Sequence, residues 1–377
     1  MTTLSRRSFG RMASLLTASG TLSLYTEPVL AQMSRLKQPI PPDAVKIDAN
    51  ENPLGPCPEA VDAVYQTIKQ GGRYMWNLTD SLAQSLGAAL NVPYDPDPAK
   101  SYIQIFAGSS APLHQTVLAF CSKDRAFVKA DPGYEAGEFA AKYAGAQLIN
   151  VPLKSGTYDH DVKAMLAAAP NAGLFYICNP NNPTGTVTSR ADIEYLVANK
   201  PKDSVVMIDE AYIHFWKDAT PCTDLAVAGK EVVILRTFSK LYGMAGLRAG
   251  AVIARPDLLA RVAQWSAGAM PITAMAGAKA SLEVKDLIPQ RRDYMTGIRE
   301  ETCGWLKLKN VEFIASQTNC FMINVKRSGK DFRSDMAQQK VLVGRSWPIW
   351  PNWIRVSVGT KDEMEQFRDA FSKCYSA

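Results

Sequence analysis

Short apolar runs alternate with segments of helical pattern between residues 102 and 254, and this alternation constrains the fold more than any other feature. Strands buried on both faces read as continuous apolar runs, and strands joined by helices usually run parallel. We therefore expect an α/β fold with a mostly parallel sheet flanked by helices. The expected strands are residues 102–108, 125–130, 146–151, 173–178, 204–209, 231–236 and 249–254.

The pattern changes after about residue 270, where a smaller α+β region is expected. Residues 321–325 and 353–359 read as strands of that region. The sequence therefore predicts one large domain followed by a smaller C-terminal domain. A last amphipathic helix would bury one face made of Met364, Phe367, Phe371 and Cys374.

Composition excludes several classes of function. The 377-residue chain is 47% apolar and 21% charged, with a net charge of +6, as is typical of a globular protein. No apolar run reaches about 18 residues, and no stretch interleaves aromatic residues with dense lysine and arginine. We expect neither a membrane span nor a nucleic-acid partner. The seven cysteines include no C-x-x-C pair and lie at no metal-ligand spacing from a histidine, so no metal site is expected. Whether any of them form disulfides stays open.

The first thirty-one residues have the pattern of an export signal. The stretch "SRRSFGR" is followed by a weakly apolar segment and by small residues that end at Ala31. Arg6 and Arg7, followed by Phe9, resemble a twin-arginine signal. We expect cleavage near Ala31 and a periplasmic or otherwise exported protein. The alternative is an ordinary basic N-terminus.

Polar side chains follow the expected strands where those strands end. Residues 108–112 end one strand and open a helix, whose free amides form an anion site. The stretch "NPNNPTG" and the residue Asp209 each end another strand, and Lys240 lies just beyond residues 231–236. In an open α/β sheet, ligands bind outside the carboxyl ends of the strands. An anion site, an acid, an amide and an amine in one crevice suit a phosphorylated cofactor with a basic ring nitrogen.

These blocks resemble a known enzyme family. The stretches "NPNNPTG", "DEAY", "TFSKLYGMAGLRAG" and "WIRVSVGT" are similar to blocks of the fold-type I pyridoxal-phosphate aminotransferases. The stretches "DANENPLGP" and "GGRY" resemble the histidinol-phosphate aminotransferase branch. The resemblance spans residues 48–360. After the signal at 1–31, it implies an N-terminal arm at 32–70 that packs on the small domain, a large cofactor-binding domain at 71–265, and a small domain at 266–377.

The resemblance also implies roles for individual residues around pyridoxal 5'-phosphate. Lys240 would form a Schiff base with the cofactor and then move a proton at the substrate α-carbon. Asp209 would pair with the pyridine nitrogen. Asn182 and Tyr212 would bind the phenolic oxygen, and Tyr134 would stack on the ring. The phosphate would be held by Ser109, Ser110, Thr237, Ser239 and Arg248, and by Tyr74 of the neighbouring subunit.

Substrate contacts are implied as well. Arg355 would bind the substrate α-carboxylate as a bidentate fork, and Asn52, Asn182 and Arg345 would also touch substrate. Because Tyr74 would act across a subunit boundary, a homodimer is expected. The activity implied is transfer of an amino group from an L-amino acid to a 2-oxo acid. Two alternatives stay open, because fold does not determine function. One is a decarboxylase or oxidase of the same fold, and the other is a non-catalytic exported binding protein.

Two departures from the family pattern bear on the substrate. Met75 stands after Tyr74 where family members usually carry proline. Arg345 lies in the stretch "VGRSWPIWPNW", out of clear register with the arginine that binds the substrate phosphate in the biosynthetic branch. The sequence therefore does not favour histidinol phosphate as the substrate. The tryptophans of that stretch are candidates either for an apolar side-chain pocket or for packing.

Overall fold

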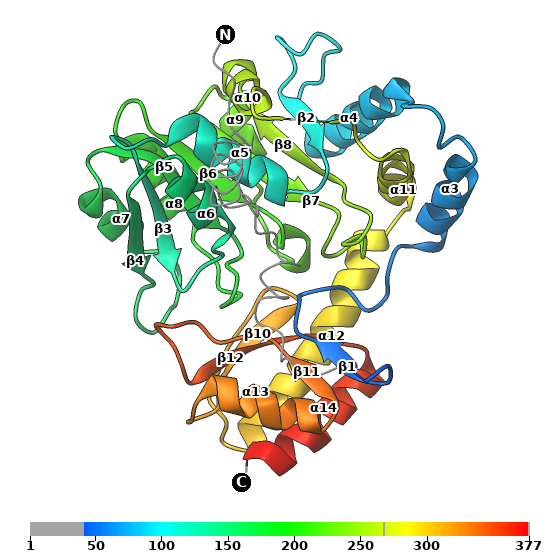
Figure 1. Cartoon of the computed structure of the whole chain (residues 1–377), viewed down its shortest axis with the longest axis vertical. Helices are drawn as coiled ribbons and strands as arrows, with labels where there is room; N and C mark the ends of the chain where they lie inside the picture. The colour runs from blue at the N-terminus through cyan, green and yellow to red at the C-terminus, as the bar shows by residue number, and fades with distance from the viewer. Residues whose placement is uncertain (1–40, 267, 376–377) are drawn as a thin grey trace, which may run out of the picture.

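The computed structural model describes residues 41–266 and 268–375 and has a seven-stranded sheet at its centre (Figure 1). The strand order is β2-β8-β7-β6-β5-β3-β4, and β8 alone runs antiparallel to its neighbours. The expected mostly parallel sheet is therefore confirmed. The strands are β2 (Ile103–Phe106), β3 (Ala126–Asp131), β4 (Leu148–Pro152), β5 (Ala172–Cys178), β6 (Val205–Asp209), β7 (Val232–Thr237) and β8 (Gly250–Ala254).

Helices cover both faces of this sheet because every central strand is apolar on both sides. In β5, Leu174 and Tyr176 belong to one buried cluster, while Phe175 and Ile177 belong to another. The first cluster is closed by α5 (Ser110–Phe120), α6 (Ala136–Tyr143) and α10 (Pro256–Ala263). The second is closed by α4 (Trp76–Leu90), α7 (Val162–Ala168), α8 (Arg190–Asn199), α9 (Thr223–Val227) and α11 (Ile272–Glu283).

A smaller α+β region lies below the large sheet in Figure 1, and the long helix α12 (Leu287–Leu308) leads into it. Its antiparallel sheet has the order β12-β10-β9. The face of the last helix that was expected to be buried is buried, from Met364 to Cys374. The elements are β9 (Phe313–Ile314), β10 (Cys320–Asn324), α13 (Gly329–Gln338), β11 (Val341–Val343), β12 (Trp353–Ser357) and α14 (Lys361–Tyr375).

The first described strand joins the two ends of the chain. Strand β1 (Val45–Ile47) pairs in parallel with β11, so residues near the start of the described chain lie on the smaller region. Helix α3 (Pro58–Ile68) then packs on α11. Strands β1, β9 and β11 were not expected, because runs of two or three residues are too short to show a period-two pattern. The domain boundaries at residues 70 and 265 stay predictions.

Some expectations fall outside what this structure describes. The export signal and its cleavage site lie before residue 41, outside the described residues. In the described part of the chain, no helix combines the length and the apolar character needed to cross a membrane. Within those same ranges, no group of three or more His, Cys, Asp or Glu side chains is placed to hold a metal ion. All seven cysteines lie in the described ranges, where each is buried and has a free thiol.

Candidate active site

A single cavity lies at the carboxyl ends of the strands of the large sheet. Residues that end β5, β6 and β7 all face it, as does the loop between β2 and α5. Every residue predicted to bind the cofactor, except Tyr74, lines this cavity. Those residues are Ser109, Ser110, Tyr134, Asn182, Asp209, Tyr212, Thr237, Ser239, Lys240 and Arg248.

Lys240 reaches into the cavity from the loop that follows β7. Its Nζ donates a hydrogen bond to the carbonyl oxygen of Asn50 (3.3 Å) and lies 5.6 Å from the centroid of the Tyr212 ring. An amine at this position can act as a nucleophile toward an aldehyde and as an acceptor of a proton.

Asp209 is the last residue of β6 and is almost fully buried. Burial raises the pKa of its carboxyl group to about 6, against the opposing effect of its hydrogen bonds and of Lys240. The Tyr176 hydroxyl donates to Oδ2 (3.0 Å), and the Ala211 backbone N–H donates to Oδ1 (3.1 Å). These two donors fix the carboxyl group in one orientation, as is needed to pair with a protonated ring nitrogen.

An anion site forms the opposite end of the cavity. Helix α5 begins at Ser110, so its first amides point toward the cavity with the positive end of the helix dipole. Arg248 adds a guanidinium group, whose Nη1 donates to Ser239 Oγ (3.1 Å). Gly108 adopts φ +80°, and a Cβ there would collide with the guanidinium group of Arg248. Only glycine therefore permits this close approach.

The donor set fits pyridoxal 5'-phosphate. The helix N-terminus, the hydroxyls of Ser109, Ser110 and Ser239, and Arg248 suit a dianionic phosphate. Thr237 Oγ1 donates to Ser239 Oγ (2.9 Å) and supports it. At the other end lie a carboxyl group for the ring nitrogen and an amine for the aldehyde.

Arg355 joins the smaller region to this cavity. It lies in β12 and is 1% exposed. Its Nη1 donates to Asn182 Oδ1 (2.9 Å) and its Nη2 donates to the carbonyl oxygen of Asp48 (2.8 Å). These contacts hold the guanidinium group beside Asn182, which itself lines the cavity. The predicted carboxylate-binding arginine is therefore next to the predicted cofactor site.

Besides Arg355, three predicted residues do not line the cavity. Asn52 donates from Nδ2 to the carbonyl oxygen of Leu241 (2.8 Å), so it holds the loop that follows Lys240. Arg345 forms a two-point ion pair with Glu135. Tyr74 is 68% exposed on the surface.

Asn50 was not assigned a role from the sequence, although it contacts both Tyr212 and Lys240. Its Nδ2 donates to the Tyr212 hydroxyl (3.0 Å), and its backbone N–H donates to Ser357 Oγ (2.8 Å). Its carbonyl oxygen accepts from Lys240 and from Asn319 Nδ2 (3.1 Å). The left-handed backbone of Asn50, at φ +53°, is a conformation that asparagine tolerates better than most residues. Asparagine at such a position is the signal that could have found it.

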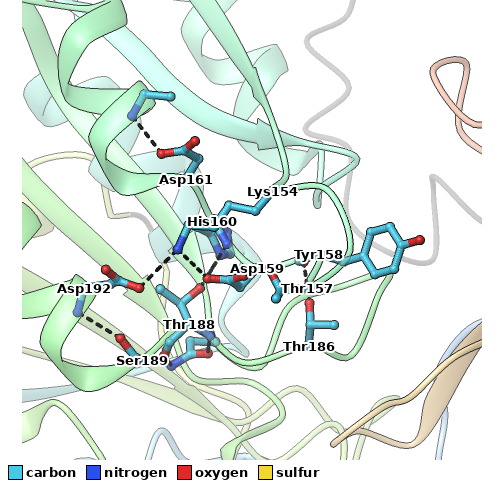
Figure 2. Close-up of polar contacts among 12 residues, drawn as sticks. Lys154, Thr157, Tyr158, Asp159, His160, Asp161, Thr186, Thr188, Ser189 and Asp192 are labelled. Carbon is cyan, nitrogen blue, oxygen red and sulfur yellow. Dashed lines mark hydrogen bonds and ion pairs between the residues drawn. The ribbon is translucent and has the colours of Figure 1, made fainter.

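The turn that carries Asn182 is supported from behind by a buried polar cluster (Figure 2). Thr186 Oγ1 donates to the carbonyl oxygen of Tyr158 (2.6 Å), and His160 Nδ1 lies 2.7 Å from Thr188 Oγ1. Thr188 in turn exchanges two hydrogen bonds with the side chain of Asn179. Burial lowers the pKa of His160 to about 4, so its ring is neutral at pH 7. His160 therefore contacts Thr188 without adding charge.

Comparison with known proteins identifies the family. The family model for aminotransferase class I and II matches residues 42–371. The chain belongs to this family. The match covers both regions of the fold and every residue that lines the cavity. It does not favour the decarboxylase, oxidase or binding-protein alternatives.

Curated relatives agree with the assignment to this family, and a solved structure has the same fold. A histidinol-phosphate aminotransferase from Moorella thermoacetica is 30% identical over 334 residues, covering 86% of this chain and 84% of the relative. An aromatic amino acid aminotransferase from Rhodococcus jostii is 31% identical over 328 residues, covering 86% and 89%. The fold matches that of a histidinol-phosphate aminotransferase from Sinorhizobium meliloti, solved with pyridoxal 5'-phosphate. That match has a TM-score of 0.81 at 23% identity and covers 95% of this chain and 98% of that one.

Proposed function

We propose that this aminotransferase uses pyridoxal 5'-phosphate to move the amino group of an L-amino acid to a 2-oxo acid. The observation that carries the proposal is one cavity that holds Lys240, Asp209 and an anion site built around Arg248. When bound, the cofactor supplies an electron-poor ring that accepts the electron pair of the broken bond at the substrate α-carbon. The protein's own residues supply orientation and proton transfer.

Each group has a task that its position suits. Lys240 Nζ would move a proton between the substrate α-carbon and the cofactor. Asp209, ionised above pH 6, holds the ring nitrogen protonated. Asn182 and Tyr212 donate to the phenolic oxygen, and Tyr134 packs on the ring face. Arg355 would bind the substrate α-carboxylate and so orient the substrate in the cavity.

We also propose that the enzyme is a homodimer in which Tyr74 of the partner subunit completes the phosphate site. Tyr74 stacks on Trp76 with ring centroids 5.2 Å apart, and both side chains are more than 60% exposed. Val61, Tyr65 and Ile68 on α3 are also exposed apolar side chains. Such a group of aromatic and aliphatic side chains is typical of a protein interface.

The protein is further proposed to be exported in folded form. The pattern around Arg6 and Arg7 supports this proposal, and so does a cofactor site whose groups converge only after folding. Changing Arg6 and Arg7 together to lysine should keep the uncleaved protein in the cytoplasm, as seen by fractionation and immunoblotting. Unchanged periplasmic accumulation would contradict the proposal.

The activity is tested with purified holoenzyme and a panel of L-amino acids, each paired with 2-oxoglutarate, pyruvate or phenylpyruvate. We expect formation of a new 2-oxo acid and a new amino acid in equal amounts, measured by mass spectrometry. Release of carbon dioxide or hydrogen peroxide without the paired amino acid would instead support a decarboxylase or an oxidase. No product from any donor would support a binding protein.

A further inference from the structure

A segment of the smaller region forms an ion pair and a hydrogen bond with the loop that carries Tyr134. Arg345 places its two terminal nitrogens on the two carboxylate oxygens of Glu135, and the Nη1–Oε1 distance is 2.6 Å. Trp347 Nε1 donates to the carbonyl oxygen of Gly133 (3.0 Å). Gly133 and Glu135, which flank Tyr134 in the sequence, are therefore both bound by residues of the smaller region.

This contact lies beside the carboxylate-binding arginine. The backbone N–H of Arg355 donates to the carbonyl oxygen of Arg345 (3.1 Å). Both guanidinium groups lie over the ring of Trp347, with Cζ at 4.2 Å for Arg345 and 5.8 Å for Arg355. Arg345, together with its partner Glu135, therefore lies close to the arginine that is proposed to hold the substrate carboxylate.

Arginines and carboxyl groups lie together around this position. Arg333 is close enough to Arg345 and Arg355 for their charges to lower its pKa, although burial lowers it more. Asp48 interacts with Arg333 and Arg355, and Glu135 pairs with Arg345. Glu51, which lines the cavity, is close enough to Asp48 to raise its pKa, although burial raises it more. The arginines near this position are therefore already opposed by carboxyl groups.

We propose that Glu135 determines the substrate class by occupying Arg345. With both terminal nitrogens of Arg345 engaged, a second anionic group on the substrate finds no available guanidinium and faces the charge of Glu135. A neutral aromatic side chain has no such penalty. The inference deepens the proposed function, because it assumes that Arg355 holds the substrate α-carboxylate.

The test compares the binding of two unreactive acids by calorimetry to holoenzyme. The acids are 3-phenylpropionate, with a neutral aromatic group, and glutarate, with a second carboxylate. Native enzyme should bind 3-phenylpropionate at least about tenfold more tightly. Glu135→Gln keeps the size of the side chain and removes its charge. It should tighten glutarate binding by about tenfold and leave 3-phenylpropionate within roughly threefold.

A matched control lies one helical turn away. Glu135 is the N-cap of α6, and Glu138, a carboxylate in the first turn of that helix, pairs with Lys129 at 3.0 Å. Glu138→Gln should leave the ratio of the two affinities unchanged. Adding Arg345→Gln to Glu135→Gln should remove the gained affinity for glutarate, because that gain requires the released guanidinium group.

Two results would overturn the inference. One is a native enzyme that already binds glutarate more tightly. The other is a Glu135→Gln variant that weakens both acids equally and lowers the melting temperature, which is the result expected if the ion pair only joins the two regions. Failure of the proposed function is detected by a separate measurement, because that function is judged by product formation in the donor panel. If Arg355 is not the carboxylate site, Arg355→Gln leaves the binding of both acids unchanged.

Discussion

The cofactor side of the cavity and its substrate side are assembled differently. The cofactor side comprises Asp209 at the end of β6, Lys240 just beyond β7, and Arg248 just before β8, all in one sheet. The substrate side consists of Arg355 and its two partners, which are 173 and 307 positions away in the sequence. The cofactor side is therefore fixed by sheet pairing within one region. The substrate side depends on how the smaller region and the N-terminal arm meet that sheet.

The comparison predicts that the largest loss comes from the cofactor side. Lys240→Ala should reduce turnover by at least about 10⁴-fold, because both the nucleophile and the proton carrier are removed. The measurement is the rate of 2-oxo acid formation. Borohydride treatment of native enzyme followed by peptide mapping should label Lys240. The control Lys123→Ala, at an exposed position, should retain full activity, and a label on another lysine would contradict the assignment.

A substitution on the substrate side should raise KM for the amino donor and leave cofactor binding unchanged. Arg355→Lys keeps the charge but loses the planar fork that contacts Asn182 and Asp48. We expect KM for the amino donor to rise by about 10²-fold, with an unchanged absorbance spectrum of the bound cofactor. Arg368→Lys, which alters a surface pair with Glu301, is the control. Loss of the cofactor spectrum in Arg355→Lys would show that the two sides are not separable.

Tyr176→Phe should produce a smaller change, confined to the cofactor side. The hydroxyl stabilises the ionised form of Asp209, and a hydrogen bond to a charged group contributes about 1.5–3 kcal/mol. Cofactor affinity should therefore fall by roughly tenfold at pH 7.5. Because the raised pKa of about 6 makes Asp209 neutral at low pH, native affinity should fall as the pH drops through 6. The variant should begin to lose affinity at a higher pH. Fluorescence titration of cofactor-free protein measures both effects, and an identical pH profile would contradict the role of Tyr176.

The smallest effect on activity is expected from His160, which supports the Asn182 turn. Its pKa is about 4 in the folded state and 6.5 unfolded, so the unfolded chain binds a proton first as pH falls. The stabilising contribution is complete above pH 6.5 and is lost between 6.5 and 4, by at most roughly 3 kcal/mol. His160→Gln should flatten this part of the denaturation profile and leave activity at pH 7.5 within about twofold. An unchanged profile would exclude the contribution of His160.

The same contrast explains what could be predicted from sequence. Asp209 and Lys240 were predictable because apolar strands and the polar residues that end them are local patterns, and parallel strands bring those ends together. Tyr176 was missed because it lies inside an apolar strand, and the residues next to it in the sequence do not show that its hydroxyl contacts Asp209. The pairing of Arg345 with Glu135 was missed because it joins residues 210 positions apart. The neutralised arginine is therefore a property of the fold rather than of either motif.

Asn50 has a consequence for the order of events during synthesis. It leaves the ribosome early, yet its partners include Asn319 and Ser357, which are made near the end. The large sheet can form before those residues exist, since its last strand ends at Ala254. Until they arrive, Asn50 lacks two of the contacts that fix the arm beside Tyr212 and Lys240. The cofactor site is therefore complete only after nearly the whole polypeptide has been translated.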